Sequence, residues 1–149
     1  TKLCATCVER INMSEENKRL AHLWNTIFEG DFAIAEEIIA EDCVYHNGPP
    51  DLLPGPDGVK EWAIMIRNGI PDIKMTVEDY VAEGDKVAGR FEAQGTHNGE
   101  FFGVPATGKP VTVSGINIMR IADGKIVEHW VQYDLMGMMQ QIGAIPGPG

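Results

Sequence analysis

The stretch Arg120–Leu135, RIADGKIVEHWVQYDL, has the pattern of a β-hairpin that leads into a helix. Apolar and polar residues alternate on both sides of the tetrapeptide ADGK at 122–125, which is typical of a tight turn between antiparallel strands. Asp134 then stands where its carboxylate can cap a short helix over LMGMMQQIG. The stretch therefore predicts the last two strands of a sheet and a closing helix.

The preceding residues have the same period of two. IKMTVEDYVA at 73–82 and KVAGRFEAQGTH at 86–97 flank a turn at Glu83-Gly84-Asp85, and VTVSGINIMRI at 111–121 supplies the strand before ADGK. GEFFGVPATGKP at 99–110 has Gly and Pro where a chain must bend, so it is interpreted as a loop. The second half of the chain is therefore predicted to be a long antiparallel sheet.

The first half has the period of helices. Ser14 is interpreted as the N-cap of a helix with an apolar stripe at Leu20, Leu23, Trp24 and Ile27. Gly30-Asp31 ends this helix and caps a short second one, a strand is expected at Cys43–Asn47, and a third helix is expected at Val59–Ile66. Helices followed by long antiparallel strands predict an α+β domain with a curved sheet wrapped over the helices.

Size, charge and cysteine content restrict the function. The 149 residues suit one domain over 13–149 with an N-terminal extension over 1–12, and a net charge of −10 disfavours nucleic acid as a partner. No apolar run is long enough for a membrane span, so we expect a soluble, cytoplasmic protein that does not bind membranes. Cys4 and Cys7 have CxxC spacing, but no second pair follows to complete a zinc site, so no metal is expected.

Three segments in this order, GTHNGEFFGVPATGK, RIADGKIVEHW and DLMGMMQQIG, resemble the SnoaL-like polyketide cyclases. The resemblance covers almost all of the chain after Met13. It implies a cone-shaped, nuclear-transport-factor-2-like fold and a reaction without metal or organic cofactor. In this family a base removes a proton beside a carbonyl, and a hydrogen-bonded pocket holds the resulting enolate.

The resemblance also shows where this chain departs from its relatives. Aligned through RIADGKI, the acid/base aspartate of the cyclases corresponds to Val131, and their histidine partner corresponds to Asn117. Valine cannot transfer a proton. The acid/base role is therefore expected to have moved, and the candidates are His129, Glu92 and Asp134, with Arg90 beside them to polarise an oxygen.

The chain also resembles the limonene-1,2-epoxide hydrolases, which share this fold. Tyr45 and Asn47 occupy the positions of their Tyr-x-Asn pair, with His46 between them, while Arg90 and Glu92 occupy those of their Arg-x-Asp pair. The remaining aspartate of these enzymes again corresponds to Val131. An epoxide hydrolase would therefore lack one of the carboxylates that position water.

Strand parity selects the residues that face the cavity. In the family register Val113, Gly115, Asn117 and Met119 point inward from one strand, and His129, Val131 and Tyr133 from the next. Arg90 and Glu92 share one face of an earlier strand, and this face is either solvent-exposed or part of the pocket. The expected ligand-contacting residues are Tyr45, His46, Asn47, Asn117, Met119, Val131, Tyr133 and Met138.

Besides the epoxide hydrolase variant, two functions remain open on the sequence. The first is a cofactor-independent cyclase or isomerase acting on a hydrophobic carbonyl compound. The second, favoured by the missing aspartate, is a non-catalytic protein that binds a small hydrophobic molecule. The methionines fit either a malleable pocket or core filling: Met65, Met119, Met136, Met138 and Met139. A homodimer is expected through the outer face of the sheet, where Ile116, Ile118 and Trp130 would lie.

Overall fold

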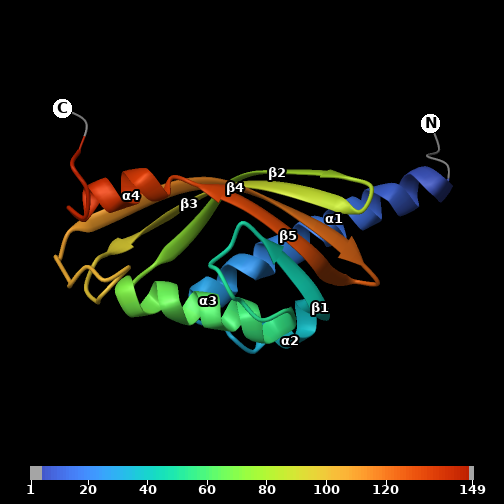
Figure 1. Cartoon of the computed structure of the whole chain (residues 1–149). Helices are drawn as coiled ribbons and strands as arrows, with labels where there is room; N and C mark the ends of the chain where they lie inside the picture. Colours follow the sequence, from blue (N-terminus) through green and yellow to red (C-terminus); the bar gives the residue numbers. More distant parts are fainter. Residues whose placement is uncertain (1–4, 148–149) are drawn as a thin grey trace.

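A computed structural model describes residues 5–147 and shows a sheet layer above a helix layer (Figure 1). The sheet is five-stranded in the order β1-β5-β4-β3-β2, with β1 parallel to β5 and every other neighbouring pair antiparallel. The strands are β1 (Ile39–His46), β2 (Lys74–Glu83), β3 (Lys86–Thr96), β4 (Pro110–Ala122) and β5 (Lys125–Tyr133).

Three helices cover one face of this sheet, and a fourth closes its end (Figure 1). They are α1 (Ala5–Phe28), α2 (Ile34–Ile38), α3 (Gly55–Gly69) and α4 (Leu135–Gln141). The predicted α+β class, with N-terminal helices packed against a mixed, mainly antiparallel sheet, is confirmed.

The start of α1 differs from the prediction. The helix begins at Ala5, so Ser14 lies inside it and is not an N-cap. Residues 5–13 are all exposed, and this end of α1 projects beyond the sheet (Figure 1). A stretch that buries no stripe gives no periodic signal, which explains why the sequence pattern placed the start too late. Of the CxxC pair, Cys7 is exposed, and Cys4 lies outside the described residues.

The start of α3 also differs from the expected Val59. Gly55 has a φ of 76° and Pro56 follows in the first helical turn, so the helix begins within the turn-rich segment. An added Cβ at Gly55 would lie 2.3 Å from the carbonyl oxygen of Glu41, so glycine lets the helix start pass close to β1.

Alternating burial along the strands forms two adjoining hydrophobic clusters. The larger lies between the helices and the inner face of the sheet and includes Leu20, Trp24, Trp62, Val87 and Met119. The smaller lies toward α4 and includes Ile70, Ile73, Phe101, Val111, Val113, Met138 and Ile142. The inward positions predicted for β4 and β5 are confirmed, since Val113, Asn117 and Met119 are buried, as are His129 and Val131.

Side-chain hydrogen bonds fix the segments at this end of the sheet. Asp134 caps α4, with Oδ1 accepting from the Gly137 N–H at 2.8 Å, as the sequence predicted. The Gln141 side chain bonds both backbone groups of Thr112, accepting from its N–H at 2.7 Å and donating to its carbonyl at 2.8 Å. These contacts hold α4 against β4.

Within residues 5–147, no helix is long and apolar enough to span a membrane.

Candidate active-site cavity

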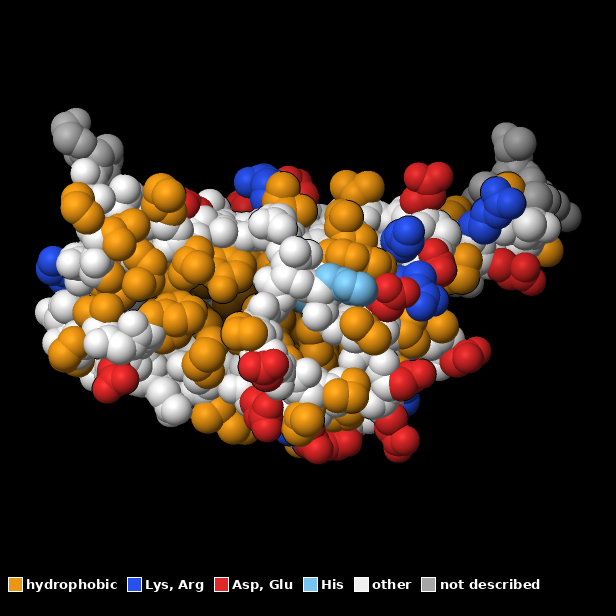
Figure 2. Space-filling view, viewed as in Figure 1, with side chains coloured by type: hydrophobic (Ala, Val, Ile, Leu, Met, Phe, Trp, Pro, Cys, Tyr) orange, Lys and Arg blue, Asp and Glu red, His pale blue; other side chains and the backbone are white. Residues whose placement is uncertain are grey.

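A cavity lies where the two hydrophobic clusters meet, between the inner face of the sheet and helices α1 and α3. Its volume is about 80 Å³. Most of its lining is apolar, and Figure 2 shows hydrophobic side chains gathered around a hollow between α3 and α4. The lining residues are Trp24, Phe28, Trp62, Ile66, Ile70, Ile73, Met75, Phe91, Ala93, Gln94, Gly95, Val111, Val113, Asn117, His129, Val131, Tyr133 and Met138.

His129 is the ionisable group with the most unusual surroundings in this cavity. Its side chain is 1% exposed, and its ring stacks on Trp24 with centroids 4.1 Å apart and planes 21° apart. Neither ring nitrogen has a hydrogen-bond partner among the described residues. Burial lowers the pKa of His129 to about 3, and the charge of His46 acts in the same direction. The imidazole is therefore neutral at physiological pH.

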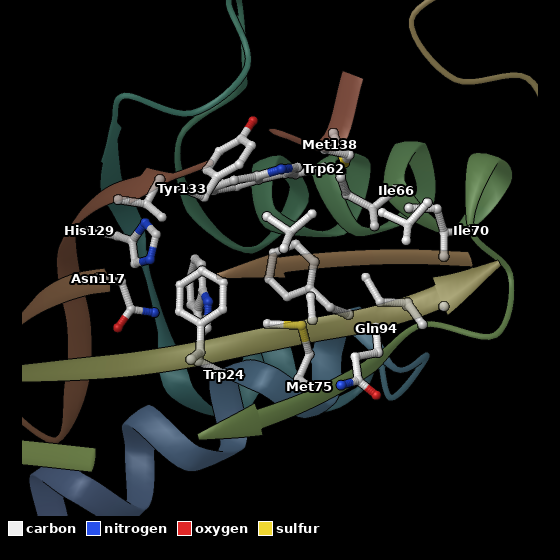
Figure 3. Close-up of a pocket in the computed structure, with 18 residues that line it drawn as sticks. Trp24, Trp62, Ile66, Ile70, Met75, Gln94, Asn117, His129, Tyr133 and Met138 are labelled. Carbon is white, nitrogen blue, oxygen red and sulfur yellow. The ribbon is translucent and has the colours of Figure 1, made fainter. Parts of the chain in front are cut away.

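Asn117 lies next to His129 on the neighbouring strand. It pairs with Val131, whereas His129 pairs with Met119, so Asn117 and His129 are diagonal neighbours on one face. An added Cβ at Gly89 would lie 2.9 Å from Asn117 Oδ1, which places the amide oxygen toward β3. Figure 3 shows the amide nitrogen of Asn117 on the cavity side, beside His129. This end of the cavity therefore presents hydrogen-bond donors.

Tyr133 contributes its ring, rather than its hydroxyl, to the lining of the cavity. Its side chain is half-buried, and burial raises the pKa of its phenol. In Figure 3 the Tyr133 hydroxyl points away from both His129 and Asn117. The polar chemistry at the closed end is thus confined to one imidazole and one amide.

The sequence profile described as SnoaL-like polyketide cyclase matches residues 17–142 of the chain. The chain belongs to the SnoaL-like polyketide cyclase family. The sequence-based recognition of this family, and of the nuclear-transport-factor-2-like fold, is confirmed.

Two relatives, one matched by sequence and one by solved structure, show how much of the chain is shared with this family. Aklanonic acid methyl ester cyclase DnrD of Streptomyces peucetius is 29% identical over 129 residues, covering 85% of this chain and 87% of the relative. The solved wild-type IdmH of Streptomyces antibioticus is 37% identical, with a TM-score of 0.73, and the match covers 86% of this chain and 98% of that one.

A third relative has a backbone more similar to this chain than that of IdmH, although its sequence is less similar than that of IdmH. TsrD from Streptomyces laurentii has a TM-score of 0.79 at 29% identity, covering 88% of this chain and 97% of that one. The chain therefore matches nearly the whole length of these two solved SnoaL-like relatives.

Arg90 and Glu92 do not reach the cavity of this SnoaL-like protein. In the β3–β4 ladder Arg90 pairs with Ile116 and Glu92 with Ser114, on the outer face. Arg90 is 55% exposed and donates to Asp79 Oδ2 at 2.7 Å, while Glu92 accepts from Gln94 at 2.5 Å. The predicted cavity placement is wrong because the inner face of β3 carries Val87, Gly89, Phe91, Ala93 and Gly95.

The three residues predicted from the end of β1 also lie outside the cavity lining. The Tyr45 hydroxyl donates to the Gly55 carbonyl, so it secures α3 rather than a ligand. His46 bonds Glu128 at 3.0 Å and stacks on Trp130, on the outer face. Asn47 is exposed in a turn with a φ of 61°. The strand ends at His46, which removes Asn47 from the predicted inward position.

The remaining predicted positions divide between the cavity wall and the core. Val131 and Met138 line the cavity, whereas Met119 is 1% exposed within the larger cluster and does not line it. The Asp134 carboxylate is engaged in capping α4 and is absent from the cavity lining. Among residues 5–147, no group of three His, Cys, Asp or Glu side chains is placed to hold a metal ion.

Sequence reasoning missed the aromatic surroundings of His129. Besides the stacked Trp24, the ring of Trp62 lies with its centroid 5.8 Å from that of His129 and nearly perpendicular to it. Trp24 was identified only as part of an apolar stripe. Nothing in a helical period shows which strand residue a tryptophan will meet, so no sequence signal could have paired it with His129.

Proposed function

We propose that this protein is a cofactor-independent cyclase that closes a ring within a hydrophobic, polyketide-like carbonyl compound. The observation that carries the proposal is His129, buried at the closed end of an apolar cavity with both ring nitrogens free of described partners. A buried polar group without a partner carries a free-energy cost, and a polar ligand group would offset it.

The low pKa of His129 restricts the chemistry. At physiological pH the imidazole is unprotonated, which is the state that a base requires. A base this weak suits only an acidic C–H bond, such as one flanked by two carbonyl groups. The stacked Trp24 presents its π-face to the ring and favours the transient imidazolium.

Ring closure then follows as an intramolecular aldol reaction. His129 takes the proton from the carbon between two carbonyls, and the Asn117 N–H donates to the enolate oxygen. The enolate carbon attacks a second carbonyl of the same molecule, forming the carbon–carbon bond. The imidazolium returns its proton to the new alkoxide, which yields a β-hydroxy carbonyl product and neutral His129.

Val131 is central to this proposal. The family resemblance places the acid/base aspartate of other members at this position, and here its side chain is a buried part of the cavity wall. We propose that the proton transfer has moved two residues along the same face of β5, to His129.

The test uses aklanonic acid methyl ester, the compound for which DnrD is named, with loss of substrate followed by chromatography and mass spectrometry. We expect the wild-type protein to form an isomeric cyclised product, and His129→Gln to lower the rate by about 100-fold or more. Glu92→Gln, on the outer face, is the matched control and should keep the wild-type rate. A His129→Gln variant with undiminished turnover would refute the assignment.

A second candidate function is non-catalytic binding of a hydrophobic molecule. It is favoured by the valine at 131, which leaves the cavity lining without a carboxylate. Saturable binding of the ester with no product, in the wild-type protein and in Val131→Asp alike, would favour the binder over the cyclase.

We further propose that two copies associate through the outer face of the sheet. Ile116 and Ile118 are 53% and 40% exposed there, beside the half-buried Trp130. Sedimentation should give the mass of a dimer for the wild-type protein and of a monomer for Ile116→Lys. A wild-type monomer at high concentration would contradict this.

A further inference from the structure

The polar groups of the cavity are separated along its length. In Figure 3 His129 and Asn117 lie at one end, while Ile66 of α3 and Ile70, which directly follows α3, lie toward the other. His129 and Asn117 are 1% and 5% exposed, whereas Gln94, at the far end from them in the same view, is exposed. The two buried polar side chains therefore lie at the closed end, and Ile66 and Ile70 lie toward the open end, where Gln94 is exposed.

The cavity also lacks a formal charge. None of its lining residues is Asp, Glu, Lys or Arg, and its single histidine has a pKa of about 3. A carboxylate bound at the closed end would lose its hydration and find no cation. Such a burial costs several kcal/mol, far more than the hydrogen bond from an amide returns.

Asn117 determines the kind of neutral group that fits. Its amide nitrogen faces the cavity and its oxygen faces β3, so it offers donors only. The neutral imidazole of His129 beside it adds no charge, and its unprotonated nitrogen stays available for the proposed base role. A neutral N–H donor complements a carbonyl oxygen, which accepts through its lone pairs.

We propose that the cavity selects uncharged, elongated molecules that enter with a ketone or ester carbonyl first and leave an apolar tail at the mouth. The carbonyl oxygen accepts from Asn117, with His129 beside it, and the tail lies against Ile66, Ile70 and Met138 between α3 and α4. This selection deepens the proposed function and rests on the same cavity.

The first measurement compares 2-octanone with octanoate, which have the same eight carbons, by calorimetric titration at mildly alkaline pH. We expect 2-octanone to bind saturably and octanoate to bind about 100-fold more weakly or worse. Equal binding of the two, or no saturable binding of 2-octanone, would overturn the proposal.

The second measurement tests orientation, using the two side-chain amides at opposite ends of the cavity. In ¹H–¹⁵N spectra of the whole protein, 2-octanone should shift the Asn117 side-chain amide and leave that of Gln94 in place. Asn117→Leu and Gln94→Glu assign the two signals. A shift confined to Gln94 would show that the carbonyl remains at the mouth and would overturn the proposal.

A variant separates recognition of the carbonyl from general apolar affinity. Asn117→Leu should weaken 2-octanone by about 10-fold while leaving 1-chlorooctane, which lacks an acceptor oxygen, within about 2-fold. An equal loss for both ligands would indicate a collapsed cavity and count against the assigned donor. All three measurements are independent of turnover. The proposed cyclase activity can therefore be refuted while the proposed ligand selection holds, and the ligand selection can be refuted while the activity holds.

Discussion

Two histidine–tryptophan stacks lie on opposite faces of β5, and their contrast explains which face carries chemistry. On the inner face His129 stacks on Trp24 at 4.1 Å, and on the outer face Trp130 stacks on His46 at 4.8 Å with planes 5° apart. Residues 129 and 130 are consecutive, so they face opposite sides of the sheet. The two stacks have similar ring geometry, but His129 is buried whereas His46 is partly exposed to solvent.

The ring of the outer histidine, His46, has a hydrogen-bond partner, and that of the inner histidine, His129, has none among the described residues. His46 bonds Glu128, whose other carboxylate oxygen accepts from Arg120 at 2.7 Å, and the pKa of Glu128 is lowered by Arg120 first and then by His46. His129 has no such partner among the described residues. A ring stacked on tryptophan is thus no sign of a site by itself, whereas an unpartnered, fully buried ring facing a cavity is.

The largest expected difference between the stacks is in stability. Trp24→Ala should lower the free energy of unfolding by about 3–5 kcal/mol, because Trp24 is buried among Phe28, Trp62 and His129. The same change at Trp130, which is half-buried, should cost roughly 1 kcal/mol. Urea denaturation of the two variants measures both values, and equal losses would show that the stacks are energetically equivalent.

The next difference is in pH dependence. The pKa of His129 is about 3 in the folded protein against an ordinary 6.5, so the unfolded chain binds more protons between these values. Its stabilising effect is complete above the ordinary pKa and is lost as the pH falls toward 3, by an amount on the order of a few kcal/mol.

Denaturation across this pH range tests the assignment. His129→Leu should flatten the loss of stability below about pH 6.5, whereas His46→Leu should retain it. An unchanged acid limb in His129→Leu would show that another group causes the slope.

A third change gives the inner histidine the kind of partner that the outer one has. Val131→Asp introduces a carboxylate two residues from His129 on the same face of β5, and it should raise the pKa of His129 by about 1–3 units. Val131→Asn, of the same shape without the charge, is the control. Titration of the His129 ring by NMR gives the value, and an unmoved pKa would show that the two side chains do not interact.

The smallest effect is expected at the outer ion pair. His46→Ala should change the free energy of unfolding by less than about 1 kcal/mol, because His46 and Glu128 are both partly solvated. Added salt should reduce the difference further. A salt-independent loss well above that limit would mean that the outer stack is buried, as in the proposed dimer.

The inward faces of β4 and β5 were predicted correctly from the sequence, whereas the face of β3 that carries Arg90 and Glu92 was left open. The tight turn at 122–125 joins β4 to β5, but a register shift between Arg120 and Ile121 reverses the side-chain parity between the turn and His129. The inward residues were therefore obtained from the family register and not from the turn. The β3–β4 connection passes through residues 97–109, and a long loop imposes no register. Arg90 could therefore be assigned to either face until its pairing with Ile116 was known.

The site itself was only partly predictable. His129, Asn117 and Val131 follow from strand period and family register, and all three line the cavity. The apolar character of the cavity and the aromatic rings around His129 depend on where α1 crosses the sheet. That crossing is decided by tertiary packing, so no local pattern in the sequence encodes it.

The parallel pairing of β1 with β5 has a consequence for how the protein folds. Tyr45 pairs with His129 across 83 intervening residues, whereas β2 to β5 are joined to their neighbours through consecutive connections. Closing so long a loop is entropically costly and slow, so the meander should form before β1 docks. During synthesis, β1 cannot pair until the residues between it and β5, and β5 itself, have been made. The pairing of β1 with β5, which flanks His129, is therefore expected to be among the last parts of the fold to form.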